Sequence, residues 1–105
     1  MLHQEIKSKQ KCDRVAMELA ADLRKELECF GNYDVDVEKT SYEANVKVTS
    51  DRPSSILTDS AIGDALKVVN VYEFMYKYVS WYIGTEERED RQIPAFIVCV
   101  SYKKD

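Results

Sequence analysis

The sequence predicts an α+β domain, a two-layer sandwich in which two helices cover one antiparallel sheet, with the element order α-β-β-α-β-β and a long C-terminal hairpin. Three patterns lead to this class. Apolar residues near the N-terminus have helical spacing, strict polar–apolar alternation follows them, and two long runs towards the C-terminus are rich in β-branched and aromatic residues. A chain of 105 residues with 45% hydrophobic positions suffices for one core, so we expect a single domain spanning residues 1–105.

The first predicted helix covers residues 12–30. Its apolar positions recur at helical spacing and form one stripe, made of Cys12, Val15, Ala16, Leu19, Leu23, Leu27 and Phe30. Gly31 and Asn32 follow, and these residue types readily adopt the left-handed conformation that ends helices. Residues 1–10 precede the pattern, and we expect them to form a frayed N-terminus.

The two alternating segments, residues 33–38 and 42–48, predict a β-hairpin with one apolar face. A turn at residues 39–40 would place Val37 opposite Tyr42 and Asp36 opposite Glu43. Neither turn residue is Gly or Asn, which a tight two-residue turn prefers, so a longer loop or a bulge is the alternative.

The second predicted helix follows Thr58, an N-cap residue, and runs to Val69. Residues 71–83 could continue it, but β-branched and aromatic side chains dominate this run, and Glu73 would lie in the centre of the apolar stripe. We therefore predict a strand over residues 71–83, with one long helix to residue 83 as the alternative.

The final hairpin joins this strand to residues 93–102 through a charged loop at residues 84–92. The predicted register places Tyr78 opposite Val98 on the face that the helices cover. Trp81 and Ile83 then lie on the opposite face, which would need a partner to cover it.

Charge and composition exclude several function classes. The 15 Lys and Arg residues against 19 Asp and Glu give a net charge of -4, and the cations are interspersed with carboxylates, so we expect no direct nucleic-acid binding. No apolar run approaches the ~18 residues of a membrane span, and no signal segment follows Met1, so we expect no membrane association. The three cysteines form no C-x-x-C pair, which favours free thiols in a reducing, cytoplasmic setting.

One group of residues resembles a catalytic or metal-binding set. Asp34, Asp36 and Glu38 share a strand face at ~6.6 Å intervals, and together they could ligate Mg²⁺ or Mn²⁺. The ordinary interpretation is a solvated strand face, because no base or phosphate-binding residue accompanies the acids. His3 is the one histidine, and no glycine-rich nucleotide loop is present, so we expect no enzyme, no metal and no cofactor, with a Mg²⁺- or Mn²⁺-dependent enzyme as a remote alternative.

By elimination, the sequence favours a non-catalytic protein-binding module, in its specific form a small acidic inhibitor of a basic nucleic-acid-handling protein, as phages and mobile elements use. The expected partner is a protein with a basic surface. The expected contact residues lie at the end of the final hairpin and on the acidic strand face: Trp81, Ile83, Glu86, Glu87, Glu89 and Asp90, then Asp34, Asp36, Glu38 and Glu43.

The alternative function is a structural subunit that forms a ring or filament through its sheet edges and its C-terminal hairpin. The element order is similar to that of small phage head-to-tail joining and tail-terminator subunits, an analogy of element order without a shared residue motif. Inhibition predicts loss of partner binding when Asp36 or Trp81 is changed, whereas assembly predicts self-association that depends on the final hairpin.

Overall fold

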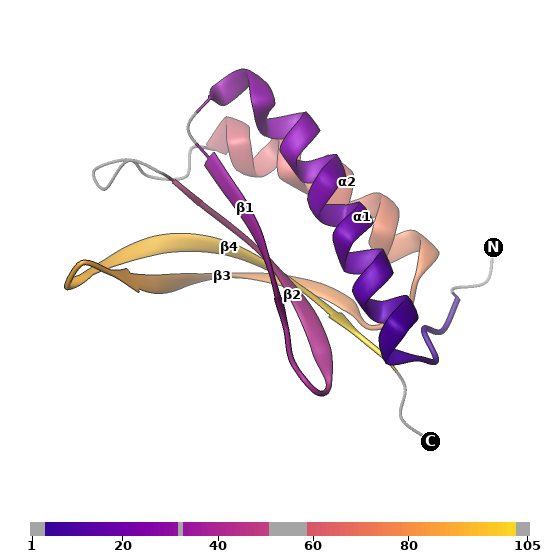
Figure 1. Cartoon of the computed structure of the whole chain (residues 1–105). Helices are drawn as coiled ribbons and strands as arrows, with labels where there is room; N and C mark the ends of the chain where they lie inside the picture. Colours follow the sequence, from indigo (N-terminus) through magenta and orange to yellow (C-terminus); the bar gives the residue numbers. More distant parts are fainter. Residues whose placement is uncertain (1–3, 32, 51–58, 103–105) are drawn as a thin grey trace.

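The computed structural model describes residues 4–31, 33–50 and 59–102 (Figure 1). Its elements are α1 (Lys9–Leu27) with a 3-10 turn (Glu28–Phe30), β1 (Tyr33–Lys39), β2 (Glu43–Ser50), α2 (Asp59–Met75), β3 (Val79–Arg88) and β4 (Arg91–Ser101). The strands form one antiparallel sheet in the order β1-β2-β4-β3, and both helices lie on the same side of it. The predicted α+β class and the element order α-β-β-α-β-β are confirmed.

The core lies between the helices and the side of the sheet that faces them, called here the inner face. Neighbouring strands contribute matched apolar side chains to it, as where Val46 of β2 lies opposite Val98 of β4. The other side of the sheet is called the outer face. Because side chains alternate along a strand, the parity of each residue decides which face it joins.

The first helix agrees with its predicted stripe and begins three residues earlier than predicted. The Ser8 side chain caps it by accepting a hydrogen bond from the backbone N–H of Lys11 at 3.1 Å, and Gly31 ends the following turn in the left-handed conformation with φ 73°. Its buried residues are Cys12, Val15, Ala16, Leu19, Ala20, Leu23 and Leu27.

The described part of the N-terminal segment is packed against the domain, in contrast to the fraying expected for residues 1–10. Ile6 is fully buried in the core. The backbone N–H of Gln4 donates to the Met75 carbonyl at 2.9 Å, and its carbonyl accepts from the N–H of Lys77 at 2.8 Å. The segment thus lies beside the chain that leaves α2.

The first hairpin has the longer loop that the sequence left open, not a turn at residues 39–40. The Thr40 hydroxyl accepts hydrogen bonds from the N–H groups of Tyr42 and Glu43, and Lys39 is the last residue to pair, with Ala44. Asp36 therefore lies opposite Lys47 instead of Glu43. The register shift is an even number of residues, so the predicted faces are kept, except that Tyr42 lies in the loop and is exposed.

The second helix continues to Met75, which corrects the strand predicted for residues 71–83. Tyr72 is buried in the core, and Glu73 lies at the side of the buried stripe rather than in its centre. Burial against α1 thus outweighs the β propensity of this run. Tyr78, with a positive φ of 65°, then turns the chain into β3. The predicted N-cap Thr58 lies outside the described residues.

The register of the last hairpin also differs from the prediction, by an odd number of residues. Trp81 pairs with Val98 and Ile83 with Phe96, so both side chains lie on the inner face, and Tyr78 is an exposed turn residue. The charged segment at residues 84–92 is mostly strand. Only Glu89 and Asp90 form the turn, both with positive φ as a type I′ hairpin requires.

Candidate protein-binding surfaces

The outer face gathers carboxylates from two stretches that are far apart in the sequence. Lys47 contacts both Glu38 of β1 and Glu86 of β3. Glu86 therefore lies on the same side of the sheet as the acids of β1 and β2. We call this set the acidic face, and it consists of Asp34, Asp36, Glu38, Glu43 and Glu86. All five were expected contact residues.

Lys47 connects the two sides of the acidic face. Its ammonium lies 2.9 Å from Glu38 Oε1 and 3.3 Å from Glu86 Oε1, so its side chain reaches across β4. The hydrogen bond to Glu38, with a smaller contribution from Glu86, raises the Lys47 pKa against the opposing effect of burial. Lys47 therefore stays cationic and fixes two of the carboxylates in place.

Arg88 links the end of β3 to the end of β2, although β4 lies between these two strands. Its guanidinium donates to Glu86 Oε2 at 3.0 Å, to the Thr49 hydroxyl at 3.2 Å and to the Ser50 carbonyl at 3.1 Å. Glu86 is thereby shared between two cations. No described cation forms a salt bridge with Asp34 or Asp36, and both are exposed.

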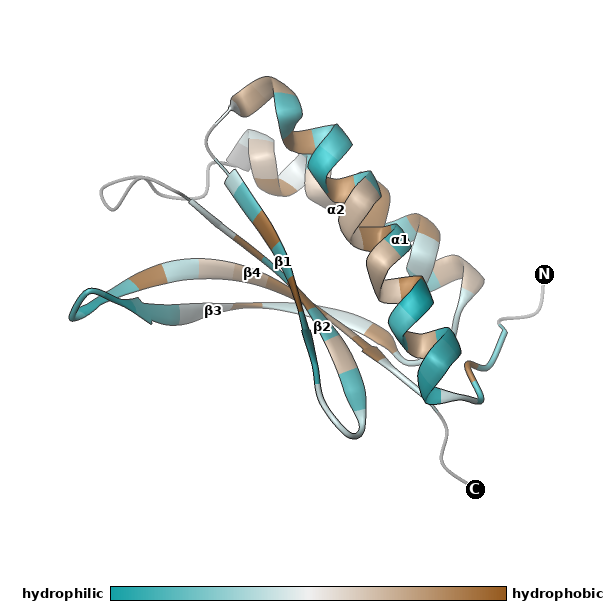
Figure 2. Cartoon of the chain, viewed as in Figure 1, coloured by the Kyte–Doolittle hydropathy of each residue, from teal (hydrophilic) through white to brown (hydrophobic). Residues whose placement is uncertain are grey.

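The hairpin end continues the acidic character beyond the sheet, and Figure 2 shows it as a hydrophilic tip. Glu87, Glu89 and Asp90 are all exposed there, beside the exposed Arg91. The expected contact residues of the 84–92 segment thus lie at the tip, next to Glu86 of the acidic face.

The apolar outer-face residues near the hairpin end are covered within the chain. Ile97 and Ala95 are buried although no helix lies over them. The ring of Tyr82 lies over Gly84, where an added Cβ would meet Tyr82 Cε2 at 3.2 Å and Ile97 Cδ1 at 3.5 Å. The outer face therefore exposes less apolar surface than the sequence pattern suggested, because Trp81 and Ile83 do not lie on it.

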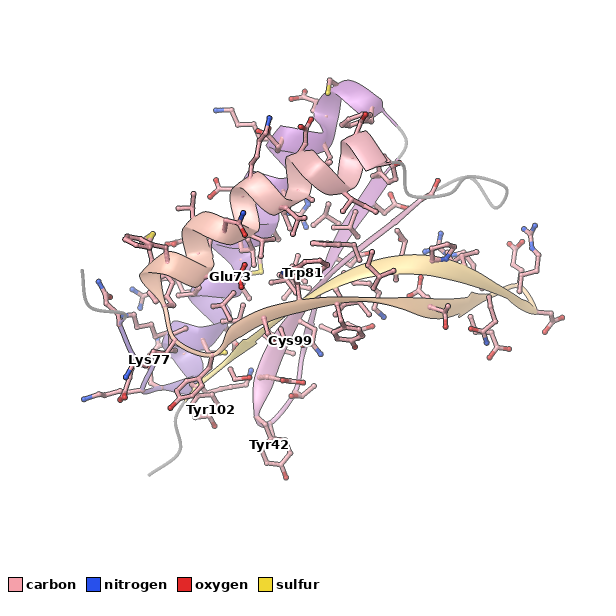
Figure 3. The ribbon with its side chains drawn as sticks, turned by 180° about the vertical axis from the view of Figure 1, so that it is seen from behind. Tyr42, Glu73, Lys77, Trp81, Cys99 and Tyr102 are labelled. Carbon is pink, nitrogen blue, oxygen red and sulfur yellow. The ribbon has the colours of Figure 1, made fainter. Side chains whose placement is uncertain are left out.

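Trp81 and Ile83 form a separate surface on the inner face of β3, the last strand of the sheet. Trp81 stacks on Phe96 with ring centroids 5.3 Å apart, yet 38% of it stays exposed, and Ile83 is 50% exposed. Figure 3 shows Trp81 between the ribbons of α2 and β3. The expected contact residues are thus divided between two surfaces on opposite sides of the sheet.

A groove of about 360 Å³ lies between α1 and α2 and was not expected from the sequence. Val68, Val71 and Tyr72 supply its apolar lining, and charged residues of both helices surround them. The Tyr72 hydroxyl donates to Asp22 Oδ2 at 2.6 Å. Burial, and then this hydrogen bond, raise the Tyr72 pKa far above its ordinary value.

The Tyr72 contact predicts a loss of stability at alkaline pH. The folded pKa is raised, so the stabilisation is complete below the unfolded value of about 10 and is lost as the pH rises above it. Tyr72→Phe should cost about 1 kcal/mol at pH 7 and should make the decline between pH 9 and 11 shallower. Urea denaturation at each pH measures both effects. An equally steep decline in Tyr72→Phe would contradict the assignment.

The three cysteines are free, as predicted. Cys12 is buried, and its thiol donates to the Val100 carbonyl at 3.1 Å. Burial raises the pKa of Cys12 and of Cys99. Both thiols are therefore held in the protonated form at neutral pH.

Within the described ranges, no three His, Cys, Asp or Glu side chains are grouped closely enough to hold a metal ion. In the same part of the chain, no helix is both long and apolar enough to span a bilayer. No protein-family model matches the chain, and neither a curated protein nor a solved structure is detectably similar to it.

Proposed function

We propose that this chain is a non-catalytic protein-binding module whose acidic face and hairpin tip bind a partner with a basic surface. The observation that supports the proposal is the gathering of carboxylates from β1, β2 and β3 on one side of the sheet. Five carboxylates share this side with three cations, Lys47, Arg88 and Arg91, among the residues described above. The outer face thus carries a net negative charge on a rigid sheet.

The ion pairs of the outer face explain how it can bind cations. Lys47 and Arg88 neutralise Glu86 and Glu38 and hold the strands together, while Asp34 and Asp36 remain exposed. Exposed charges on a rigid surface accelerate encounter with an oppositely charged partner and add specificity. The finer form of the proposal is inhibition of a basic nucleic-acid-handling protein, because the carboxylates repeat at ~6.6 Å along β1 and can replace phosphates on a cationic surface.

A charge-matched pair of variants tests this proposal. The probe is a fluorescein-labelled peptide of eight arginines, and binding is measured by fluorescence anisotropy at low and at physiological salt. We expect Asp34→Asn with Asp36→Asn to raise the Kd about fivefold, from roughly 0.5 kcal/mol for each exposed charge.

The control is Glu18→Gln with Glu28→Gln, which changes the net charge equally on exposed positions of the helical layer. We expect its Kd to stay within a factor of two of the wild type. If both double variants weaken binding equally, binding follows net charge and the acidic face is not the site. A labelled DNA duplex serves as a second probe, and binding to it would contradict a preference for basic partners.

A further inference from the structure

The two edges of the sheet differ in how well they resist pairing with another strand. Of the seven residues in β1, Asp34, Asp36, Glu38 and Lys39 are charged. The first five residues of β3, residues 79–83, include no charged side chain. Charges on an edge strand discourage pairing with other chains, so β3 is the edge that is open to it within the part of the chain that the structure describes.

The hydrogen bonds of β3 show which backbone groups its free edge presents. The N–H of Ser101 donates to the Tyr78 carbonyl at 3.1 Å, so Tyr78 directs its backbone groups towards β4. In an antiparallel ladder this direction alternates with each residue. Val79, Trp81, Ile83 and Thr85 therefore direct their N–H and C=O groups towards the free edge.

From this edge we infer that β3 pairs antiparallel with β3 of a second copy of the chain, about a two-fold axis at Tyr82. This inference is independent of the proposed function, because it uses the edge of the sheet and not its acidic face. It joins the two sheets into one of eight strands. The backbone directions permit only registers that pair odd-numbered residues with odd-numbered residues, and an axis at Tyr82 satisfies this condition.

The side chains select this register among those permitted. Trp81 of each copy lies opposite Ile83 of the other, so the two half-exposed apolar residues cover each other twice. An axis at Ile83 would instead place Trp81 opposite Thr85 and Val79 opposite Glu87. The stack of Trp81 on Phe96 holds the indole in place before association, which lowers the entropy lost on binding.

Charge is also complementary in this arrangement. The acidic end of one β3, with Glu86 and Glu87, lies beside the uncharged start of the other, and Lys77 of each copy comes near Glu87 of its partner copy. Lys77 is half-exposed in its contact with Glu5, and Glu87 is exposed, so both are accessible. A two-fold axis perpendicular to a sheet does not exchange the two sides of that sheet. The acidic faces of both copies therefore lie on the same side of the dimer.

Sedimentation equilibrium of the full chain from 1 to 500 μM tests the self-association. We expect a monomer–dimer equilibrium whose Kd rises at least tenfold in Ile83→Lys, which places a charge opposite Trp81. The control is Val71→Lys, an equally exposed apolar residue of α2, and it should dimerise like the wild type. A monomer at every concentration, or an Ile83→Lys dimer as stable as the wild type, would overturn the inference without affecting the proposed function.

A cysteine variant tests the register separately. In a Cys29→Ser, Cys99→Ser background, Tyr82→Cys should form a disulfide-linked dimer in oxidised glutathione, because the pair on the axis has Cα atoms about 4.5 Å apart. Thr85→Cys is the control, since residue 85 lies opposite Val79 of the second copy and not opposite itself. Equal cross-linking of the two variants would overturn the register, and so would its absence in Tyr82→Cys.

Discussion

Phe96→Ala is expected to lower the free energy of unfolding by about 3–5 kcal/mol, because it removes the largest fully buried side chain of the core. Phe96 lies on the inner face of β4, between Val48 of β2 and Ile83 of β3, and its ring stacks on Trp81. The surrounding strands are held by their hydrogen bonds, so the cavity can close only in part. A small domain is stable by about 5–15 kcal/mol, and the loss is therefore a large share of the total.

Urea unfolding followed by circular dichroism measures this loss. Trp81 is the only tryptophan and contacts the deleted ring, so its fluorescence should shift to longer wavelength in the folded variant as well. Tyr42→Ala is the control, because Tyr42 is 66% exposed in a loop and should change stability by less than about 0.5 kcal/mol. A loss below about 1 kcal/mol for Phe96→Ala would show that this position is not closely packed.

Local sequence patterns were sufficient to predict most elements of the fold. The apolar stripe from Cys12 to Leu27 and the left-handed residue Gly31 that ends the helix both depend on residues close together in the sequence. Both are found as predicted. The alternation in β1 and β2 likewise assigned Val35 and Val46 to the helix-facing side. These features depend on periodicity alone, which the sequence displays directly.

The errors arose where a long-range contact overrides local preference. Residues 71–75 favour a strand by composition, but Tyr72 fills a space against α1 and keeps the chain helical. The strand therefore starts at Val79, and the register of β3 against β4 differs from the predicted register by an odd number of residues. Trp81 and Ile83 consequently changed faces, which no local pattern could have shown.

The acidic site was predictable residue by residue but not as one surface. Alternation placed Asp34, Asp36 and Glu38 on one face, and this assignment is confirmed. That Glu86 joins them depends on the strand order β1-β2-β4-β3 and on the reach of Lys47 across β4. The spacing of residues in the sequence did not indicate that Lys47 pairs with both Glu38 and Glu86, which lie far apart along the chain.

Val79→Asp, compared with Ser80→Asp, is expected to show which register the final hairpin adopts. Val79 is buried on the inner face opposite Val100, so an aspartate there loses an apolar contact and buries a charge. We expect a loss of about 3–5 kcal/mol, enough to unfold a marginally stable domain. Ser80 is exposed on the outer face opposite Cys99, and the same charge there should cost less than about 1 kcal/mol.

Thermal and urea unfolding of both variants by circular dichroism measure the difference. The two positions are adjacent in one strand, so strand propensity and distance from the strand end are nearly the same for both. The register predicted from the sequence alone placed Ser80 under the helices and Val79 on the opposite face. A larger loss in Ser80→Asp than in Val79→Asp would therefore restore that register. It would return Trp81 and Ile83 to the outer face, which carries Asp36, and would move Glu86 to the inner face.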